Sequence, residues 1–140
     1  MATVKWKGPE FVRLLTEHVI KGVDTGSIRL QKEVKRQLAR YMARRRRGGA
    51  RPPADKLGLD TGTLTRSIQV DRRHLRDNRT PRTRVGTNLV YGPVHEFGSR
   101  DGNTPKRPFM RPAKRATEDA IIKDIDNRVK RAIREFRGVR

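Results

Sequence analysis

The sequence contains no cysteine, few aromatic residues and no long apolar run. Without cysteine, neither disulfide bonds nor thiolate-ligated zinc sites can form. No stretch approaches the ~20 apolar residues that cross a bilayer, and the first residues lack the apolar run of a signal peptide. We therefore expect no membrane partner and synthesis in the cytoplasm. Aromatic residues, at 5%, are too sparse for a protein dedicated to stacking on single-stranded bases.

Acidic residues are also scarce. The 140 residues include 35 Lys and Arg against 15 Asp and Glu, so the formal net charge is +20. A chain of this length with 33% hydrophobic residues can form one modest core, and we predict a single domain over residues 1–140. Because self-repulsion at this charge opposes compaction, an acidic partner is expected, and DNA is the obvious candidate.

The sequence lacks a recognisable catalytic constellation. Its histidines, His18, His74 and His95, do not stand at metal-ligand spacing, and its carboxylates are scattered. No serine lies in a G-x-S-x-G setting, and the glycines do not form a phosphate-binding loop. We therefore predict a protein that is not an enzyme and has no catalytic residues, cofactor or metal. His95 is interpreted as a structural hydrogen-bonding residue.

The first third of the chain has helical periodicity. Pro9 suits a helix start, and arginines followed by Gly48 suit a helix stop. Residues 22–26, Gly-Val-Asp-Thr-Gly, interrupt the pattern, and either a kink or a real break is consistent with them. Residues 44–60, which include two consecutive prolines, are predicted to form a mobile loop. The apolar residues at helical spacing are Phe11, Leu14, Leu15, Val19, Leu30, Val34, Leu38 and Tyr41.

The middle of the chain predicts a capped helical turn and a hairpin. The turn covers residues 60–67, and the first strand passes through Ile68 and Val70. A turn signal at residues 77–81 precedes a second strand within residues 83–90.

A long amphipathic helix is predicted at the C-terminus, with Pro112 in its first position. Two amphipathic helices packed on a small antiparallel sheet make an α+β domain. The apolar stripe predicted for this last helix comprises Ile122, Ile125, Val129, Ala132, Ile133 and Phe136.

Two segments before the last helix combine glycine, proline and aromatic residues. Residues 91–98 read Tyr-Gly-Pro-Val-His-Glu-Phe-Gly, and residues 108–113 read Pro-Phe-Met-Arg-Pro-Ala. Gly98 is suited to ending a helical turn with a positive φ. Because glycine and proline control backbone direction, we expect these two segments to orient the chain and not to take part in catalysis.

Proline restricts the residue before it, so Pro108 and Pro112 should push Arg107 and Arg111 toward extended geometry, with Phe109 held between them. For Phe97 we expect a place in the core. For Phe109 two alternatives are open: the core of its own subunit or a pocket of a neighbouring subunit.

The arginines form two clusters, one near the end of the first helix and one at the hairpin tip. Such clusters bind phosphate without reading sequence, and the binding weakens steeply with salt. A solvated surface is the alternative interpretation. The candidate residues for contact with DNA or another subunit are Arg44, Arg45, Arg46, Arg47, Arg72, Arg73, Arg79 and Arg82.

Four segments in order carry a resemblance to a known family: residues 61–68, residues 85–88 (Val-Gly-Thr-Asn), residues 91–98 and residues 107–113. The series resembles the tail-completion family of long-tailed bacteriophages, the neck or head–tail joining proteins. Any one motif is weak, but the four in order are fairly specific. The residues that match the family pattern are Thr61, Gly62, Leu64, Ser67, Ile68, Tyr91, Glu96, Phe97, Gly98, Pro108, Phe109 and Pro112.

The resemblance implies a structural virion protein without enzymatic activity. It implies a ring, expected to be a hexamer, that completes the tail at the head–tail junction. Its partners would be further copies of the chain, the tail tube protein and the head-completion or connector proteins, with the packaged DNA end as an open possibility. The competing hypothesis, based on charge alone, is a free DNA-binding protein that does not read sequence.

Overall fold

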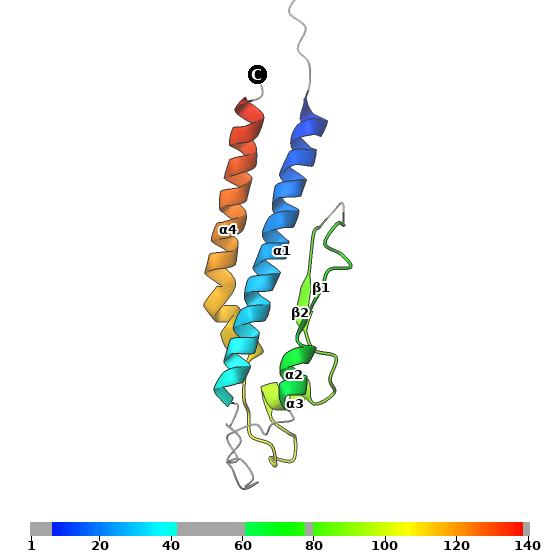
Figure 1. The fold of residues 1–140 in the computed structure, drawn as a ribbon, viewed down its shortest axis with the longest axis vertical. Coiled ribbons are helices and arrows are strands. Elements are labelled where there is room, and N and C mark those ends of the chain that lie inside the picture. The colour runs from blue at the N-terminus through cyan, green and yellow to red at the C-terminus, as the bar shows by residue number, and fades with distance from the viewer. Residues whose placement is uncertain (1–6, 42–60, 78–79, 139–140) are drawn as a thin grey trace, which may run out of the picture.

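The structure is a computed structural model that describes residues 7–41, 61–77 and 80–138. The predicted mobile loop over residues 44–60, the arginines at 44–47 and Arg79 lie outside the described residues. The elements, in chain order, are α1 (Gly8–Tyr41), α2 (Thr61–Ser67), β1 (Gln69–Asp71), β2 (Arg84–Gly86), α3 (Gly92–Phe97) and α4 (Met110–Gly138) (Figure 1).

The helix α1 lies between two other layers. α4 runs antiparallel along one side of it, and the β1–β2 hairpin lies along the other (Figure 1). The start of α1 and the end of α4 extend beyond the hairpin at one end of the molecule (Figure 1). The short helices α2 and α3 lie at the other end (Figure 1). The α+β class is confirmed, with one difference from the predicted arrangement: α4 packs on α1, which lies between it and the hairpin, and not on the sheet.

The predicted interruption at residues 22–26 is not a break, since α1 continues through it. Gly22 and Gly26 are buried against α4. A Cβ added at Gly26 would lie 2.7 Å from Ile121 Cγ2, and one at Gly22 would lie 3.0 Å from Ile125 Cγ1. The glycines therefore let the two helices approach closely, and the resulting packing offsets their low helix propensity.

The seam between the helices continues toward the ends of α1 and α4. The rings of Phe11 and Phe136 are 4.9 Å apart between centroids, and His18 Nε2 lies 3.0 Å from Glu135 Oε2. The prediction that Ile122 belongs to this seam is wrong, because its side chain is 60% exposed. Ile121 takes that place, since it stands four residues before Ile125 on the same helix face.

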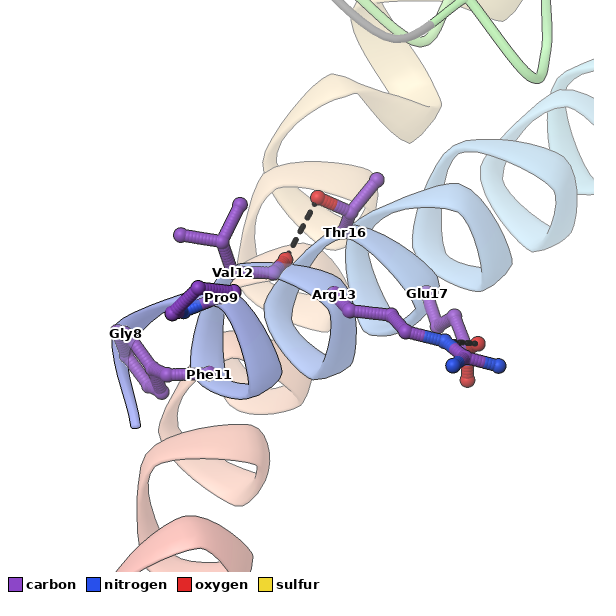
Figure 2. Close-up of a pocket in the computed structure, with 7 residues that line it drawn as sticks. All are labelled: Gly8, Pro9, Phe11, Val12, Arg13, Thr16 and Glu17. Atoms are coloured by element: carbon purple, nitrogen blue, oxygen red, sulfur yellow. Dashed lines mark hydrogen bonds and ion pairs between the residues drawn. The ribbon is translucent and has the colours of Figure 1, made fainter. Parts of the chain in front are cut away.

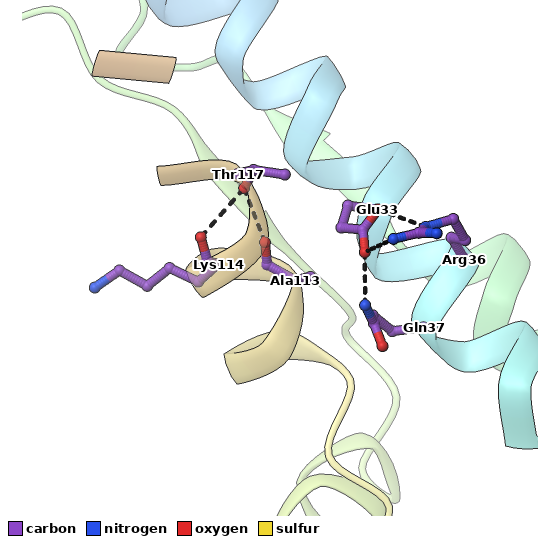
Figure 3. A network of polar contacts seen from close by, with 6 residues as sticks. All are labelled: Glu33, Arg36, Gln37, Ala113, Lys114 and Thr117. Carbon is purple, nitrogen blue, oxygen red and sulfur yellow. Dashed lines mark hydrogen bonds and ion pairs between the residues drawn. The ribbon is translucent and has the colours of Figure 1, made fainter. Parts of the chain in front are cut away.

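Buried polar side chains near the start of α4 have partners within their own helix (Figure 3). Thr117 Oγ1 donates to the carbonyl oxygen of Ala113 at 2.9 Å. On α1, Gln37 Nε2 donates to Glu33 Oε1 at 2.6 Å. The Arg36 guanidinium also binds the Glu33 carboxylate, and it lowers the pKa of that group. The helix interface thus buries these polar groups without leaving them unpaired.

One apolar cluster joins α1, α2 and the start of α4. Phe109 is its largest member and is 1% exposed, so it belongs to the core of its own chain. The expectation that Phe97 fills the core is wrong, because that side chain is 53% exposed. The other buried members of the cluster are Val34, Leu38, Leu64, Ile68 and Ala113.

The hairpin has two short strands that pair antiparallel, with Val70 opposite Val85. The first strand begins one residue after Ile68, and the second is shorter than predicted. Gln31 Nε2 of α1 donates to the carbonyl oxygen of Ile68 at 2.8 Å, just before β1. This bond and the burial of Ile68 fix the position of the hairpin against α1.

Candidate functional site: the α3–α4 corner and the basic hairpin

The carboxylate of Glu96 connects α3 to the start of α4. Its Oε2 accepts hydrogen bonds from the backbone N–H of Phe109 at 2.7 Å and of Met110 at 2.9 Å. Its Oε1 accepts one from Arg111 N–H at 3.1 Å. Glu96 is 7% exposed. A buried carboxylate at a helix N-terminus is stabilised both by these donors and by the helix dipole.

This arrangement accounts for the amide groups of the first turn of α4. Such groups have no partner within a helix. Glu96 binds those of Phe109, Met110 and Arg111, and Pro112 has no N–H. The prediction that Arg111 is extended is wrong, since α4 already begins at Met110 and Pro112 is its third residue. Proline is tolerated in the first turn of a helix, because the N–H group that it lacks would have no partner within the helix there.

The role of Glu96 was not identified from the sequence. The signal for it is an absence: the residues before α4, Arg107, Pro108 and Phe109, include no Ser, Thr, Asp or Asn that could cap the helix. A long helix without a local cap requires acceptors from elsewhere in the chain.

Contacts also connect the earlier motif segments. Ser67 Oγ, at the end of α2, lies 2.6 Å from Thr87 Oγ1, which follows β2. The same Thr87 hydroxyl accepts a bond from Leu89 N–H. Its methyl group lies against Gly92, where an added Cβ would be only 2.5 Å away. Gly92 is therefore required by the packing of α3 against the residues that follow β2.

The turn after α3 depends on Gly98, which has φ +83° as expected. Its N–H donates to the carbonyl oxygen of Val94, and a Cβ there would meet Thr104 O and Lys106 Cγ. The carbonyl oxygen of His95 accepts a bond from Arg107 N–H at 2.8 Å. Among the described residues, His95 Nδ1 has no hydrogen-bond partner, so its expected side-chain bond is not present there. Burial and the nearby Arg107 lower the pKa of His95.

The remaining residues of the family pattern have more peripheral places. Tyr91 is 39% exposed, and its ring meets the ring of His95 edge-on at 5.8 Å. The Pro108 carbonyl oxygen accepts a bond from the Tyr41 hydroxyl at 3.4 Å. Thr61 begins α2, and Gly62 lies beside the Arg66 side chain within it.

The predicted basic cluster of the hairpin is partly neutralised. Arg72 Nε lies 2.5 Å from Asp24 Oδ1 of α1. Arg73 binds Asp71 through two nitrogens and lowers the pKa of that carboxyl group well below its usual range. Arg82 is exposed. Arg72 therefore links the hairpin to α1, whereas Arg82 is exposed to solvent.

A shallow apolar depression lies on the first turns of α1, lined by residues between Gly8 and Glu17 (Figure 2). The described residues that line it all belong to this one helix, and their polar groups bond to each other: Thr16 Oγ1 to Val12 O at 2.8 Å, and Arg13 to Glu17 at 3.6 Å. Within the part of the chain that the structure describes, no polar group from a second element lines it. The depression therefore has one wall and lacks the convergent groups of a ligand site.

Metal-binding and membrane-spanning features are both absent from residues 7–41, 61–77 and 80–138. Within these ranges, no group of three or more His, Asp or Glu side chains is placed to hold a metal ion. In the same part of the chain, no helix combines the length and apolar character needed to span a bilayer.

Comparison with known proteins identifies a short stretch of similarity. The chain is 42% identical over 48 residues to the uncharacterized protein MJ0331 of Methanocaldococcus jannaschii. The match covers 34% of this chain and about a third (36%) of that relative. No protein-family profile matches the chain, and no solved structure matches it.

Proposed function

We propose that this chain is a structural component of a tailed-phage virion, without enzymatic activity. In this role it forms a ring at the head–tail interface, expected to be a hexamer, that completes the tail. Its partners are other copies of itself, the tail tube protein and the head-completion proteins. The place of action is the neck of the particle.

The observation that carries the proposal is that the four motif segments form one connected unit. Ser67 contacts Thr87, Thr87 packs on Gly92, and Glu96 binds the amides that open α4. Ser67 and Thr87 are 20 residues apart and Glu96 and Phe109 are 13 apart, so these two contacts join separate motif segments. The contacts support the interpretation that the series is the signature of one fold.

The use of the buried carboxylate also supports a structural role. Glu96 is the buried acidic residue of the described chain, and its two oxygens are occupied by backbone amides. A general acid or base needs a carboxylate that can reach a substrate proton. Glu96 instead determines the direction of α4.

The test is electron microscopy of the phage that encodes this chain. We expect density for the α1–α4 pair and the hairpin, repeated around the axis at the head–tail junction. Particles made without the chain should separate into filled heads and free tails, and the wild-type chain supplied from a plasmid should restore joining. Intact infectious particles in its absence would refute the proposal.

A second candidate is a free DNA-binding protein, favoured by the exposed arginines Arg76, Arg82 and Arg84 at the hairpin. A salt titration of the isolated protein with duplex DNA separates the two. Tight binding at low salt with a steep dependence on salt concentration would favour this candidate. Negligible binding at low salt would remove it.

A further inference from the structure

Exposed apolar side chains are concentrated beside α3. Val90 is 92% exposed, Phe97 is 53% exposed and Tyr91 is 39% exposed. Elsewhere in the described chain, the large exposed apolar side chains are Val12 and Ile122, which are far from each other in sequence. Single apolar side chains are ordinary on a protein surface, whereas a group of them indicates a contact surface. We call Val90, Tyr91 and Phe97 the α3 face.

The two sides of α3 differ in character. Gly92 and Glu96, four residues apart on one side, are buried. Phe97, the residue after Glu96, lies about 100° further around the helix and is exposed, and Val90 and Tyr91 are exposed directly before α3. Because Gly92 packs on Thr87 and Glu96 binds the start of α4, the backbone that carries the α3 face is held in place. A preorganised apolar group loses little conformational freedom on binding.

Positive side chains border the α3 face. The Arg111 guanidinium lies 5.2 Å from the centre of the Phe97 ring. Lys106 lies beside Gly98, directly after Phe97, and both Lys106 and Arg100 are exposed. The acidic residue of the same loop, Asp101, is hydrogen-bonded to Asn103. The surface therefore combines apolar anchors with a basic border.

We propose that the α3 face is a docking site for an acidic protein segment that places an apolar side chain against Phe97 and carboxylates against Arg111. A second copy of the chain is a poorer occupant, because a symmetric contact would bring the two basic borders together and each copy carries a charge of +20. This inference does not rest on the proposed virion role, since it concerns the isolated chain.

The probe is a fluorescent amphipathic peptide built of leucine and glutamate, with two companions in which glutamine or lysine replaces glutamate. Each is titrated with the full chain by fluorescence anisotropy at about 0.15 M salt, where nonspecific attraction is screened. We expect the glutamate peptide to bind most tightly and Phe97→Ser to weaken that binding about tenfold or more. The matched control, Ile122→Ser, also removes an exposed apolar side chain and should change the affinity less than about twofold.

Several results would overturn the proposal. One is equal affinity of the glutamate peptide for the wild type and Phe97→Ser, since binding would then come from general charge. Another is a preference for the glutamine peptide. Dimers that Phe97→Ser abolishes in sedimentation velocity would assign the face to a second copy of the chain. Val90→Ser provides the same test if Phe97→Ser fails to fold.

The chain's own segment between α1 and α2 is one further candidate occupant. Tighter binding of the glutamate peptide by a variant with Leu57→Ser and Leu59→Ser would mean that this segment covers the α3 face, and would also overturn the proposal. Unchanged affinity in that variant supports an external partner.

Discussion

At the scale of single residues, the Glu96 carboxylate is predicted to stabilise the fold by capping α4. Glu96→Gln removes the negative charge that accepts three backbone N–H groups at the start of α4. We expect a loss of about 2–3 kcal/mol in the free energy of unfolding, because hydrogen bonds to charged groups contribute more than neutral ones. Denaturant titration measures this loss.

The control for that measurement is Glu118→Gln, which removes an exposed carboxylate from α4 itself. Glu118 lies 3.9 Å from Lys114 in a surface ion pair. Such pairs contribute less than about 1 kcal/mol. Equal stability of the two variants would contradict the capping role of Glu96.

The two phenylalanines of the corner should respond differently to truncation. Phe109→Ala empties a fully buried site and should cost about 3–5 kcal/mol. Phe97→Ala removes a half-exposed ring and should cost less than about 1 kcal/mol. Thermal melts of both variants check the prediction, and it is wrong if Phe97→Ala is the more damaging change.

The histidine beside Glu96 should make stability depend on pH. Burial and Arg107 lower the pKa of His95 in the folded chain, so the unfolded chain binds its proton more readily. The stability that this shift contributes is fully present above the unfolded pKa of about 6.5 and is lost as pH falls from there toward the lower folded pKa. Below the folded pKa it no longer changes.

His95→Gln provides the measurement, because it removes the titrating group. We expect the melting temperature to fall less between about pH 7.5 and about pH 5 in this variant than in the wild type. The pKa of Asp71 is also lowered, but that carboxyl titrates at more acidic pH and leaves this comparison unaffected. Identical pH profiles of the two proteins would count against the prediction.

At the scale of elements, the close approach of α1 and α4 depends on Gly26. Gly26→Ala would improve helix propensity by about 1 kcal/mol. It would also place a methyl group 2.7 Å from Ile121 Cγ2. Overpacking of this kind costs about 1–3 kcal/mol. We therefore expect net destabilisation, with partial rescue by Ile121→Ala in the double variant.

Gly62→Ala is the matched control for the helix crossing. Gly62 also lies in a helix, but among the described residues an added Cβ would meet the flexible Arg66 side chain alone, at 3.6 Å. We expect this variant to be neutral or slightly stabilised. If Gly26→Ala were equally harmless in denaturant titrations, the glycines would not be required for the helix approach.

At the scale of the whole molecule, charge remains the property with the least structural explanation. On the hairpin, Arg72 and Arg73 are paired with Asp24 and Asp71. The hairpin arginines Arg76, Arg82 and Arg84 are exposed, and the arginines at 44–47 add four further positive charges to the sequence. Both the virion role and the DNA-binding alternative require some of these groups to contact a partner.

Replacing Arg44, Arg45, Arg46 and Arg47 by serine tests that requirement. We expect an unchanged melting temperature and impaired head–tail joining or genome retention in the particle. If the cluster binds DNA, the salt dependence of binding should also become shallower, by about one unit of slope for each phosphate that the arginines no longer neutralise. Normal infectious particles from this variant would contradict the prediction.

The sequence by itself determined the helices and the fold class, because hydrophobic periodicity is a local property. The spacing of Val34 and Leu38 placed α1, and the positions of Ile68 and Val70 indicated the hairpin. Gly98 also has the positive φ that its place after α3 required.

Only the tertiary structure determined the roles of the residues where α3 meets the start of α4. Gly26 allows α4 to approach α1 closely because Ile121 of α4 packs against it. The burial of Phe109 and the exposure of Phe97 depend on how α3 meets α4. The partners of Glu96 are likewise more than a helical turn away in sequence. Local patterns carry no information about such contacts, because their energy arises only when distant segments pack together.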